Sequence, residues 1–257
     1  MKSAVLLLTC LFFFLLISCD DSGNNPSTGL SVVVNLMEYD EALDRSETVA
    51  FDNVQSTTVD NREVIYFSEI ISSDLIPKYD NKTPDDASDD YDRRPLYAYR
   101  ITGSDGYNTH DRKAEPDLTW DTLQLGYLAK ENRNAGYDDG LGLPNMYYVD
   151  DVATIGVYRK IDVISPDTSY MVELADLNSD TVAGESAVSL TSLMAGVASP
   201  ETNSFSIEAI DGYKKDFTWA QIQTGSLMLD SDRMHFDPGL GGGAEIVNIL
   251  KITLTRI

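Results

Sequence analysis

The sequence offers few side chains that could carry out chemistry. It contains two histidines, His110 and His235, and two cysteines, Cys10 and Cys19. Neither histidine stands near a serine and an acid in a pattern typical of a catalytic triad, and the two lack the spacing of paired metal ligands. We therefore predict no catalytic constellation, no cofactor and no metal site, and we interpret both histidines as incidental.

Two acidic segments carry enough side-chain oxygens to suggest calcium binding. Residues 176–180 place Asp, Asn and Asp at alternate positions, but Thr181 stands where a calcium loop needs glycine and Ala187 where it needs an acid. The run 85–92 is denser in aspartate but has no fixed ligand geometry. We interpret residues 176–180 as a solvated loop between strands. We expect the charges of the run 85–92 to repel one another and to keep that run mobile, and weak binding of calcium or of a basic partner by this run is the alternative.

Glycine-rich and tyrosine-rich stretches give weak signals. Residues 239–243 are rich in glycine, but no Lys-Ser or Lys-Thr follows them, so they indicate a flexible connection rather than a phosphate loop. The tyrosine pairs at 97 and 99 and at 147 and 148 could stack on sugars or on a protein partner. Alternation within expected strands makes packing inside a sheet an equal alternative for both pairs.

The first 18 residues predict an export signal. Lys2 precedes an almost wholly apolar run, 4–17, which is shorter than the roughly 20 residues that span a bilayer. Leu16-Ile-Ser-Cys19 resembles the lipobox of bacterial lipoproteins. The resemblance implies that residues 1–18 are removed and that Cys19 is lipidated, and an ordinary signal peptide or an uncleaved anchor is the alternative.

Residues 19–44 then form a lipidated tether, and the protein is expected in the cell envelope. Its lipid would anchor it to the outside of the inner membrane or to the outer membrane. Removal of Lys2 changes the formal charge from −23 to −24. Such a charge disfavours nucleic acid and anionic lipid as partners. With Cys10 removed and Cys19 acylated, the mature chain has no thiol for a disulfide, a nucleophile or a metal.

Two parts of the chain repeat one another. Thr119-Trp120 and Thr218-Trp219 each open the pattern Thr-Trp-x-x-(Leu/Ile)-Gln-x-Gly-x-Leu and contain the only two tryptophans. Upstream of each stands Asp-Gly-Tyr, a sequence typical of a tight turn with positive φ at glycine. These motif residues are Asp105, Gly106 and Tyr107 in one copy and Asp211, Gly212 and Tyr213 in the other.

The repeat predicts an α+β fold of two tandem duplicated units of mixed β-sheet with short helices, over residues 45–164 and 165–257. The expected order is strand, short helix, strand, Asp-Gly turn, tryptophan-bearing helix and strand. Thr218 and Gln221 fit a capping box, and Thr119 could cap its own helix. Gly126 and Gly225 stand where each helix is expected to end. We expect each unit to bury its tryptophan and the pair to pack face to face.

This order of elements resembles the sulfite-oxidase-type molybdopterin-binding fold, with Lys160 or Lys251 as the basic residue of the last strand in each unit. The resemblance implies a mixed α+β core. Members of that family ligate molybdenum through a cysteine, which the mature chain lacks, and hold the pterin phosphate with basic residues, which are scarce in the second unit. The resemblance therefore implies scaffold copies without the redox centre.

Together these patterns predict a non-catalytic cell-envelope lipoprotein that acts as a binding or assembly module. Its partner would be an unknown envelope protein or a small ligand held between the units. One alternative is a degenerate or accessory oxidoreductase of the molybdopterin-binding family. The other is a carbohydrate-binding surface lipoprotein that uses the tyrosines.

Overall fold

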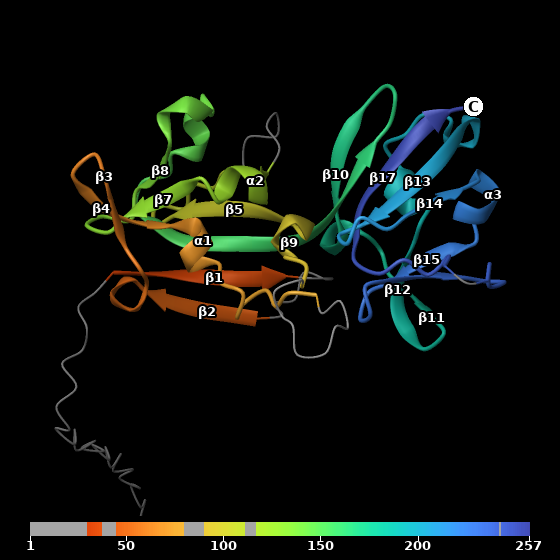
Figure 1. Ribbon diagram of the computed structural model, residues 1–257, viewed down its shortest axis with the longest axis horizontal. Coiled ribbons are helices and arrows are strands. Elements are labelled where there is room, and N and C mark those ends of the chain that lie inside the picture. The colour runs from red at the N-terminus through yellow and green to blue at the C-terminus, as the bar shows by residue number, and fades with distance from the viewer. Residues whose placement is uncertain (1–29, 38–44, 80–89, 111–116, 242) are drawn as a thin grey trace, which may run out of the picture.

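The computed structural model describes residues 30–37, 45–79, 90–110, 117–241 and 243–257. These residues form seventeen strands in one nine-stranded and two four-stranded sheets, with three short α-helices (Figure 1). The export signal, Cys19 and most of the acidic run 85–92 lie outside the described residues.

We call residues 30–158 the first half and residues 159–257 the second half. The elements up to the shared strand are β1 (Ser31–Met37), β2 (Arg45–Ala50), β3 (Thr57–Val59), β4 (Arg62–Tyr66), α1 (Phe67–Ile70), β5 (Tyr97–Gly103), β6 (Leu118–Thr119), α2 (Trp120–Leu123), β7 (Gly126–Ala129), β8 (Ala135–Tyr137) and β9 (Val152–Ile164).

The elements after the shared strand are β10 (Ser169–Glu173), β11 (Asp180–Val182), β12 (Glu185–Ser189), β13 (Asn203–Ala209), β14 (Lys214–Phe217), α3 (Trp219–Ile222), β15 (Gly225–Met228), β16 (Arg233–Phe236) and β17 (Ile249–Arg256). Short 3-10 turns connect them, among them η1 (Phe51–Asn53), η2 (Arg94–Leu96), η5 (Leu174–Asp176) and η7 (Pro200–Thr202).

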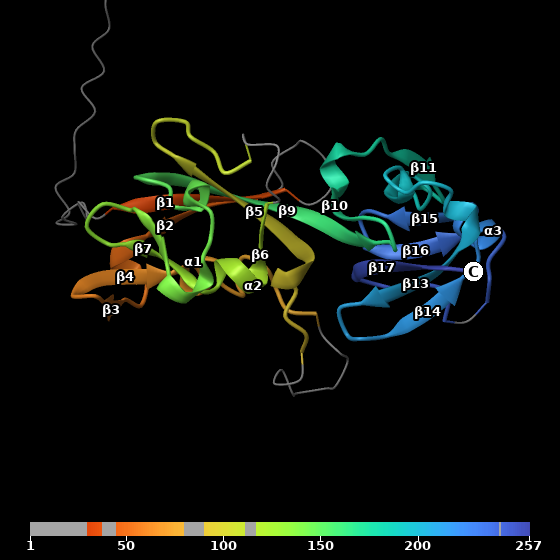
Figure 2. The same cartoon turned by 90° about the horizontal axis from the view of Figure 1, so that it is seen from above.

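Strand β9 runs through both halves (Figure 2). Its first part pairs with β1 in parallel and with β5 antiparallel, from Val152 to Arg159. Its last part, from Lys160 to Ile164, pairs with β10 antiparallel and with β17 in parallel. The first part of β9 therefore belongs to the strand pairings of the first half and its last part to those of the second half, and β9 joins both into one nine-stranded sheet.

The strand pairings have the same order in both halves. In the first half β2 pairs β1, β1 pairs β9, β9 pairs β5 and β5 pairs β6. In the second half β10, the end of β9, β17, β13 and β14 pair in the same order and with the same directions. The antiparallel sheets β3-β4-β7-β8 and β11-β12-β15-β16 also correspond strand by strand.

Each half has its own hydrophobic cluster. The first extends along the chain to Val157 and the second begins at Ile161, so the change of core falls inside β9. The halves consequently lie side by side along this strand, and the expected face-to-face packing is not observed (Figure 1).

The predicted tether is corrected at residues 31–37, which form β1. Val32, Val34 and Leu36 alternate with half-buried residues and are at most 6% exposed. Alternation of this kind is typical of a strand with one face on a core. The tether assignment can apply only to residues before Leu30 and, outside the described part of the chain, to residues 38–44.

The fold is mainly β, with three sheets, one of them mixed, and three short α-helices, so the predicted mixed sheet and short helices are confirmed, whereas helices are a smaller part of the fold than an α+β class implies. Each α-helix has four residues, about one turn. Gly126 and Gly225 do not end helices but begin β7 and β15. A Cβ on Gly126 would lie 2.4 Å from the Tyr137 ring, and one on Gly225 would lie 2.7 Å from the Phe236 ring. Each glycine is therefore needed for close packing under an aromatic ring.

The two tryptophan-bearing helices differ in their caps. Thr218 and Gln221 form the predicted capping box, in which the Thr218 amide donates to Gln221 Oε1 at 2.8 Å. Thr119 makes no side-chain capping bond, so the expectation that it caps its helix is wrong. The reciprocal glutamine is missing from that copy because Thr122 stands in its place.

The two tryptophans have matching aromatic neighbours. Trp120 lies 5.7 Å from Tyr99 and Trp219 lies 5.7 Å from Phe205, measured between ring centroids. The register of the two sheets makes Tyr99 and Phe205 equivalent positions. Trp120 is buried, with the Arg94 guanidinium 4.3 Å above its ring, whereas Trp219 is half-buried. The prediction that each unit buries its tryptophan is thus met in full only in the first half.

Candidate functional site: an ionic cluster between the halves

A group of ionisable side chains joins the two halves around Arg100 of β5. Its Nε donates to Asp117 Oδ2 at 2.9 Å, and its Nη2 donates to Glu173 Oε1. Asp117 directly precedes β6 in the first half, whereas Glu173 ends β10 in the second half. We call Arg100, His110, Asp117 and Glu173 the seam cluster.

The backbone of β9 explains why Arg100 can lie flat over the sheet. Arg100 pairs with Gly156, and a Cβ on that glycine would lie 2.7 Å from the ring of Tyr158. The Tyr158 ring therefore folds over Gly156. The Arg100 guanidinium carbon stacks 4.0 Å from the centroid of that ring, which gives it a cation–π contact.

The connection from β5 to β6 brings His110 into the cluster. Thr109 is fully buried, and its Oγ1 and amide bond to the amide and carbonyl of Ile101, each at 3.1 Å. This anchor positions His110, whose Nδ1 lies 3.2 Å from Asp117 Oδ1. The His110 side chain is 55% exposed, so solvent reaches one side of the cluster.

Charge within the cluster is not balanced when both carboxyls are ionised and His110 is neutral. Asp117 and Glu173 are 7% and 9% exposed, and Arg100 supplies one positive charge between them. Burial raises the pKa of Glu173 to about 8, helped by its hydrogen bond with Asp117 and opposed by the charge of Arg100. Burial alone would lower the pKa of Arg100, but the two carboxylates raise it. The cluster is therefore suited to hold a proton or another cation.

The same residues have ligand atoms close enough for a metal. One atom each from His110, Asp117 and Glu173 lie within 4.8 Å of one another. Sequence reasoning treated His110 as incidental and did not single out Arg100, Asp117 or Glu173. A signal existed at Arg100, because it interrupts the otherwise apolar run Leu-Tyr-Ala-Tyr-Arg-Ile from residue 96 to 101.

A second ionic contact fastens the halves where β9 passes between them. Arg159 is fully buried, and its Nε and Nη2 each lie 3.0 Å from a carboxylate oxygen of Asp232. The guanidinium also donates to the carbonyls of Leu96 at 3.2 Å and Ile249 at 2.7 Å. These partners come from both halves, so the contact ties η2 and β17 to the turn before β16.

Two adjoining hollows beside the seam cluster form what we call the seam groove. Their volumes are about 220 Å³ and 310 Å³, and Thr119 and Asp162 line both. Lys160 pairs with Asp162, and Lys251 lies 3.0 Å from Glu208, so an acid partly neutralises each lysine. The other lining residues are Pro95, Trp120, Asp121, Leu250, Val163, Ile164, Ser169, Tyr170 and Met171.

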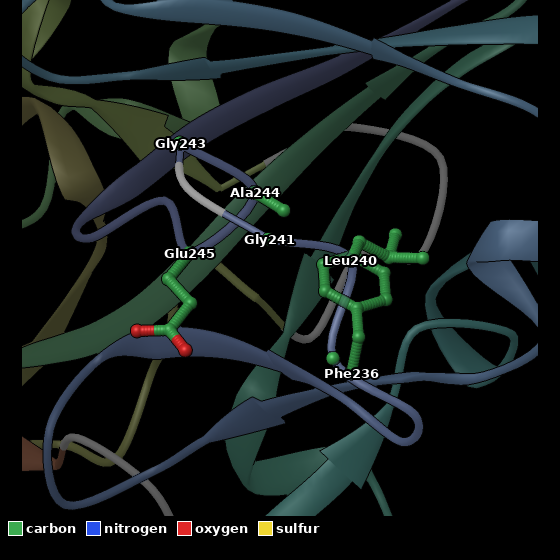
Figure 3. A pocket seen from close by; sticks show the side chains of 7 residues that line it. Phe236, Leu240, Gly241, Gly243, Ala244 and Glu245 are labelled. Atoms are coloured by element: carbon green, nitrogen blue, oxygen red, sulfur yellow. The ribbon is translucent and has the colours of Figure 1, made fainter.

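The glycine-rich connection before β17 lines a separate pocket of about 490 Å³. Figure 3 shows Phe236 and Leu240 in this pocket, with the Glu245 carboxylate directed away from them. Gly239, Leu240, Gly241 and Gly243 are among its lining residues, and the carboxylate of Glu245 disfavours a phosphate ligand.

The Asp-Gly-Tyr motifs form matching turns. Gly106 has φ +85° and Gly212 φ +80°, and Asp105 Oδ1 and Asp211 Oδ1 accept from the tyrosine amides at 2.9 and 2.8 Å. The hydroxyls of Tyr107 and Tyr213 donate to the carbonyls of Met146 at 3.2 Å and Gly243 at 2.9 Å. Each motif therefore fastens the connection that leads into the last strand of its half, and neither lines the seam groove.

The remaining candidate residues do not come together. His235 lies on β16, and residues 176–180 connect η5 with β11. Tyr97, Tyr99 and Tyr147 are at most 5% exposed, and only Tyr148 of the two tyrosine pairs is open to solvent, at 41%. Packing therefore accounts for three of these four side chains.

Comparisons with known proteins found no matching family model, no matching curated protein and no matching solved structure. Among the described residues, no helix has both the length and the apolar character that a membrane crossing requires.

Proposed function

We propose that the chain is a non-catalytic, lipid-anchored module of the cell envelope that binds an envelope protein or a small ligand in the seam groove. The observation that supports this proposal most directly is the place of the groove. It lies between two halves that buried contacts at Arg100 and Arg159 hold in a fixed arrangement. A preformed hollow with apolar walls and a few polar groups is typical of a binding site.

We also propose that the two halves are duplicated units. The repeated sequence patterns, the matching order of strand pairings and the equivalent neighbours of Trp120 and Trp219 support this. A groove between two copies gives the module a site that neither copy forms alone, because Thr119 and Lys251 come from different halves.

Site-specific photo-crosslinking in cells tests the binding role. A photoreactive residue replaces Met171 in the groove, and in the control it replaces Ser186, which is exposed on β12 away from the groove lining. The proposal requires an adduct of defined mass at 171 that is absent at 186. Identical adduct patterns at both positions, or none at 171, would contradict it.

The lipid anchor has its own test. Cys19→Ser should move the protein from the membrane fraction to the soluble periplasmic or medium fraction, because the acyl chains provide the attachment. Membrane association that survives this substitution would contradict lipidation as the means of attachment. We do not carry the carbohydrate alternative further, since most of the tyrosines proposed for it are buried.

A further inference from the structure

We propose that His110, Asp117 and Glu173 form a binding site for a first-row divalent transition metal that links the two halves. The inference goes beyond the proposed binding role and does not depend on it. One imidazole nitrogen and two carboxylate oxygens lie within 4.8 Å of one another. Imidazole nitrogen and carboxylate oxygen both bind zinc, and zinc sites with three protein ligands leave a further position to water.

Arg100 orients the two carboxylates without using all their oxygens. It binds Asp117 through Oδ2, whereas Asp117 Oδ1 faces His110 Nδ1 at 3.2 Å. It binds Glu173 through Oε1. Ligating carboxylates are generally held by such outer hydrogen bonds, which fix their direction and strengthen binding.

The charges around the site leave room for a cation. The ionisable groups that face the site are Arg100, Asp117, His110, Glu173 and, in the neighbouring turn, Asp176. Lys160 is the strand partner of Glu173, but its ammonium group bonds to Asp162. Two buried carboxylates therefore share one guanidinium.

Comparison of the halves shows that the fold itself does not require this cluster. The sheet register places Ser206 of the second half where the first half has Arg100, and Ala50 of the first half where the second half has Glu173. Asp216, the counterpart of Asp117, is exposed. The second half thus forms the same pairings with no such group, which favours a role for the cluster beyond strand pairing.

The ligand types select the class of ion. An imidazole nitrogen favours zinc, cobalt or nickel over calcium and magnesium, which prefer oxygen ligands only. Zinc is the probe of choice. Calcium is the comparison ion, and it should bind this site much more weakly than zinc.

Isothermal titration of the full-length lipoprotein in detergent, stripped of metal by a chelator, tests the site. We expect one zinc ion per chain, and affinity lowered at least about tenfold in both His110→Ala and Glu173→Gln. His235→Ala, which removes the only other histidine, is the matched control and should keep the affinity of the parent protein. Thermal melting without metal establishes that each variant is folded.

A further measurement separates this site from binding elsewhere. X-ray absorption at the zinc edge should show one nitrogen among oxygen ligands and no sulfur. Absence of saturable zinc binding overturns the proposal, and so does binding that is unchanged in folded His110→Ala.

Discussion

The two halves share their strand pairings, but they differ in which partner of one ion pair, the arginine or the aspartate, stands in the equivalent turn. In the first half the turn between β7 and β8 carries Arg133, with φ +61°, which binds Asp151 and donates to the Ser31 carbonyl at 3.1 Å. The equivalent turn between β15 and β16 carries Asp232, with φ +45°, which accepts from buried Arg159. Arg159 in turn donates to the carbonyl of Lys160, the counterpart of Ser31.

Both turns hold a residue with positive φ, and in both halves an arginine donates to a carbonyl of equivalent strands, β1 in the first half and the last part of β9 in the second. The arginine comes from the turn in the first half and from the strand β9 in the second half. The environments differ, however, because the Asp151 side chain is 48% exposed and the Asp232 side chain 5%.

The largest expected difference between the halves concerns this exchanged contact. Asp232→Asn should lower the free energy of unfolding by about 3–5 kcal/mol, because it leaves the buried Arg159 charge without its partner. Arg133→Gln should cost no more than about 1 kcal/mol, since that pair is partly solvated. Urea unfolding of both variants measures this. Equal losses would show that burial does not distinguish the two contacts.

The repeated glycines should give effects of similar size in both halves. Gly126→Ala and Gly225→Ala should each cost about 1–3 kcal/mol, because the new methyl group would overlap a neighbouring ring. Gly239→Ala is the control, since a Cβ there meets no atom within 4 Å. Thermal unfolding of the three variants measures these losses of stability. A stable variant at either repeated glycine would show that its ring can move aside.

The helix caps should distinguish the halves by a smaller amount. Thr218→Ala should cost about 1 kcal/mol by removing the capping box, whereas Thr119→Ala removes no capping bond and should cost less. The difference in urea midpoint between the two variants measures this. A larger loss for Thr119→Ala would contradict the assignment of the caps.

The smallest expected effect is a pH dependence of stability that arises at Glu208 of the second half. Burial raises the pKa of Glu208, but hydrogen bonds from Lys214 and Lys251 outweigh it and hold that pKa below its usual value of 4.5. The resulting stability is present above the unfolded-state pKa and is lost as pH falls through the folded-state pKa.

Glu208→Gln should therefore flatten the loss of stability below about pH 4.5 by less than about 1 kcal/mol. The counterpart of Glu208 in the first half is the uncharged Thr102, so Thr102→Val is the matched control and should leave the pH profile unchanged. Denaturant unfolding from pH 3 to 6 measures both. A profile that Glu208→Gln leaves unchanged would contradict the assigned ion pairs.

Local patterns were enough to predict several structural details. Asp-Gly-Tyr predicted two turns with positive φ at glycine, and Thr218 with Gln221 predicted a capping box, because both depend on residues within one turn of each other. The helices at the tryptophans are short, as predicted, and each chain segment continues as a strand that begins at Gly126 or Gly225. The seam cluster was missed because Arg100 and Glu173 are 73 positions apart.

The sequence by itself determined the local turns, the repeated aromatic and glycine positions and the acidic charge, because each of these is a property of neighbouring residues or of composition. Only the tertiary structure decided that β9 serves both halves, that Arg159 meets Asp232 and that His110 lies against Asp117 and near Glu173. These contacts depend on strand register and on which faces become buried. Neighbouring residues do not determine either until the sheet has formed.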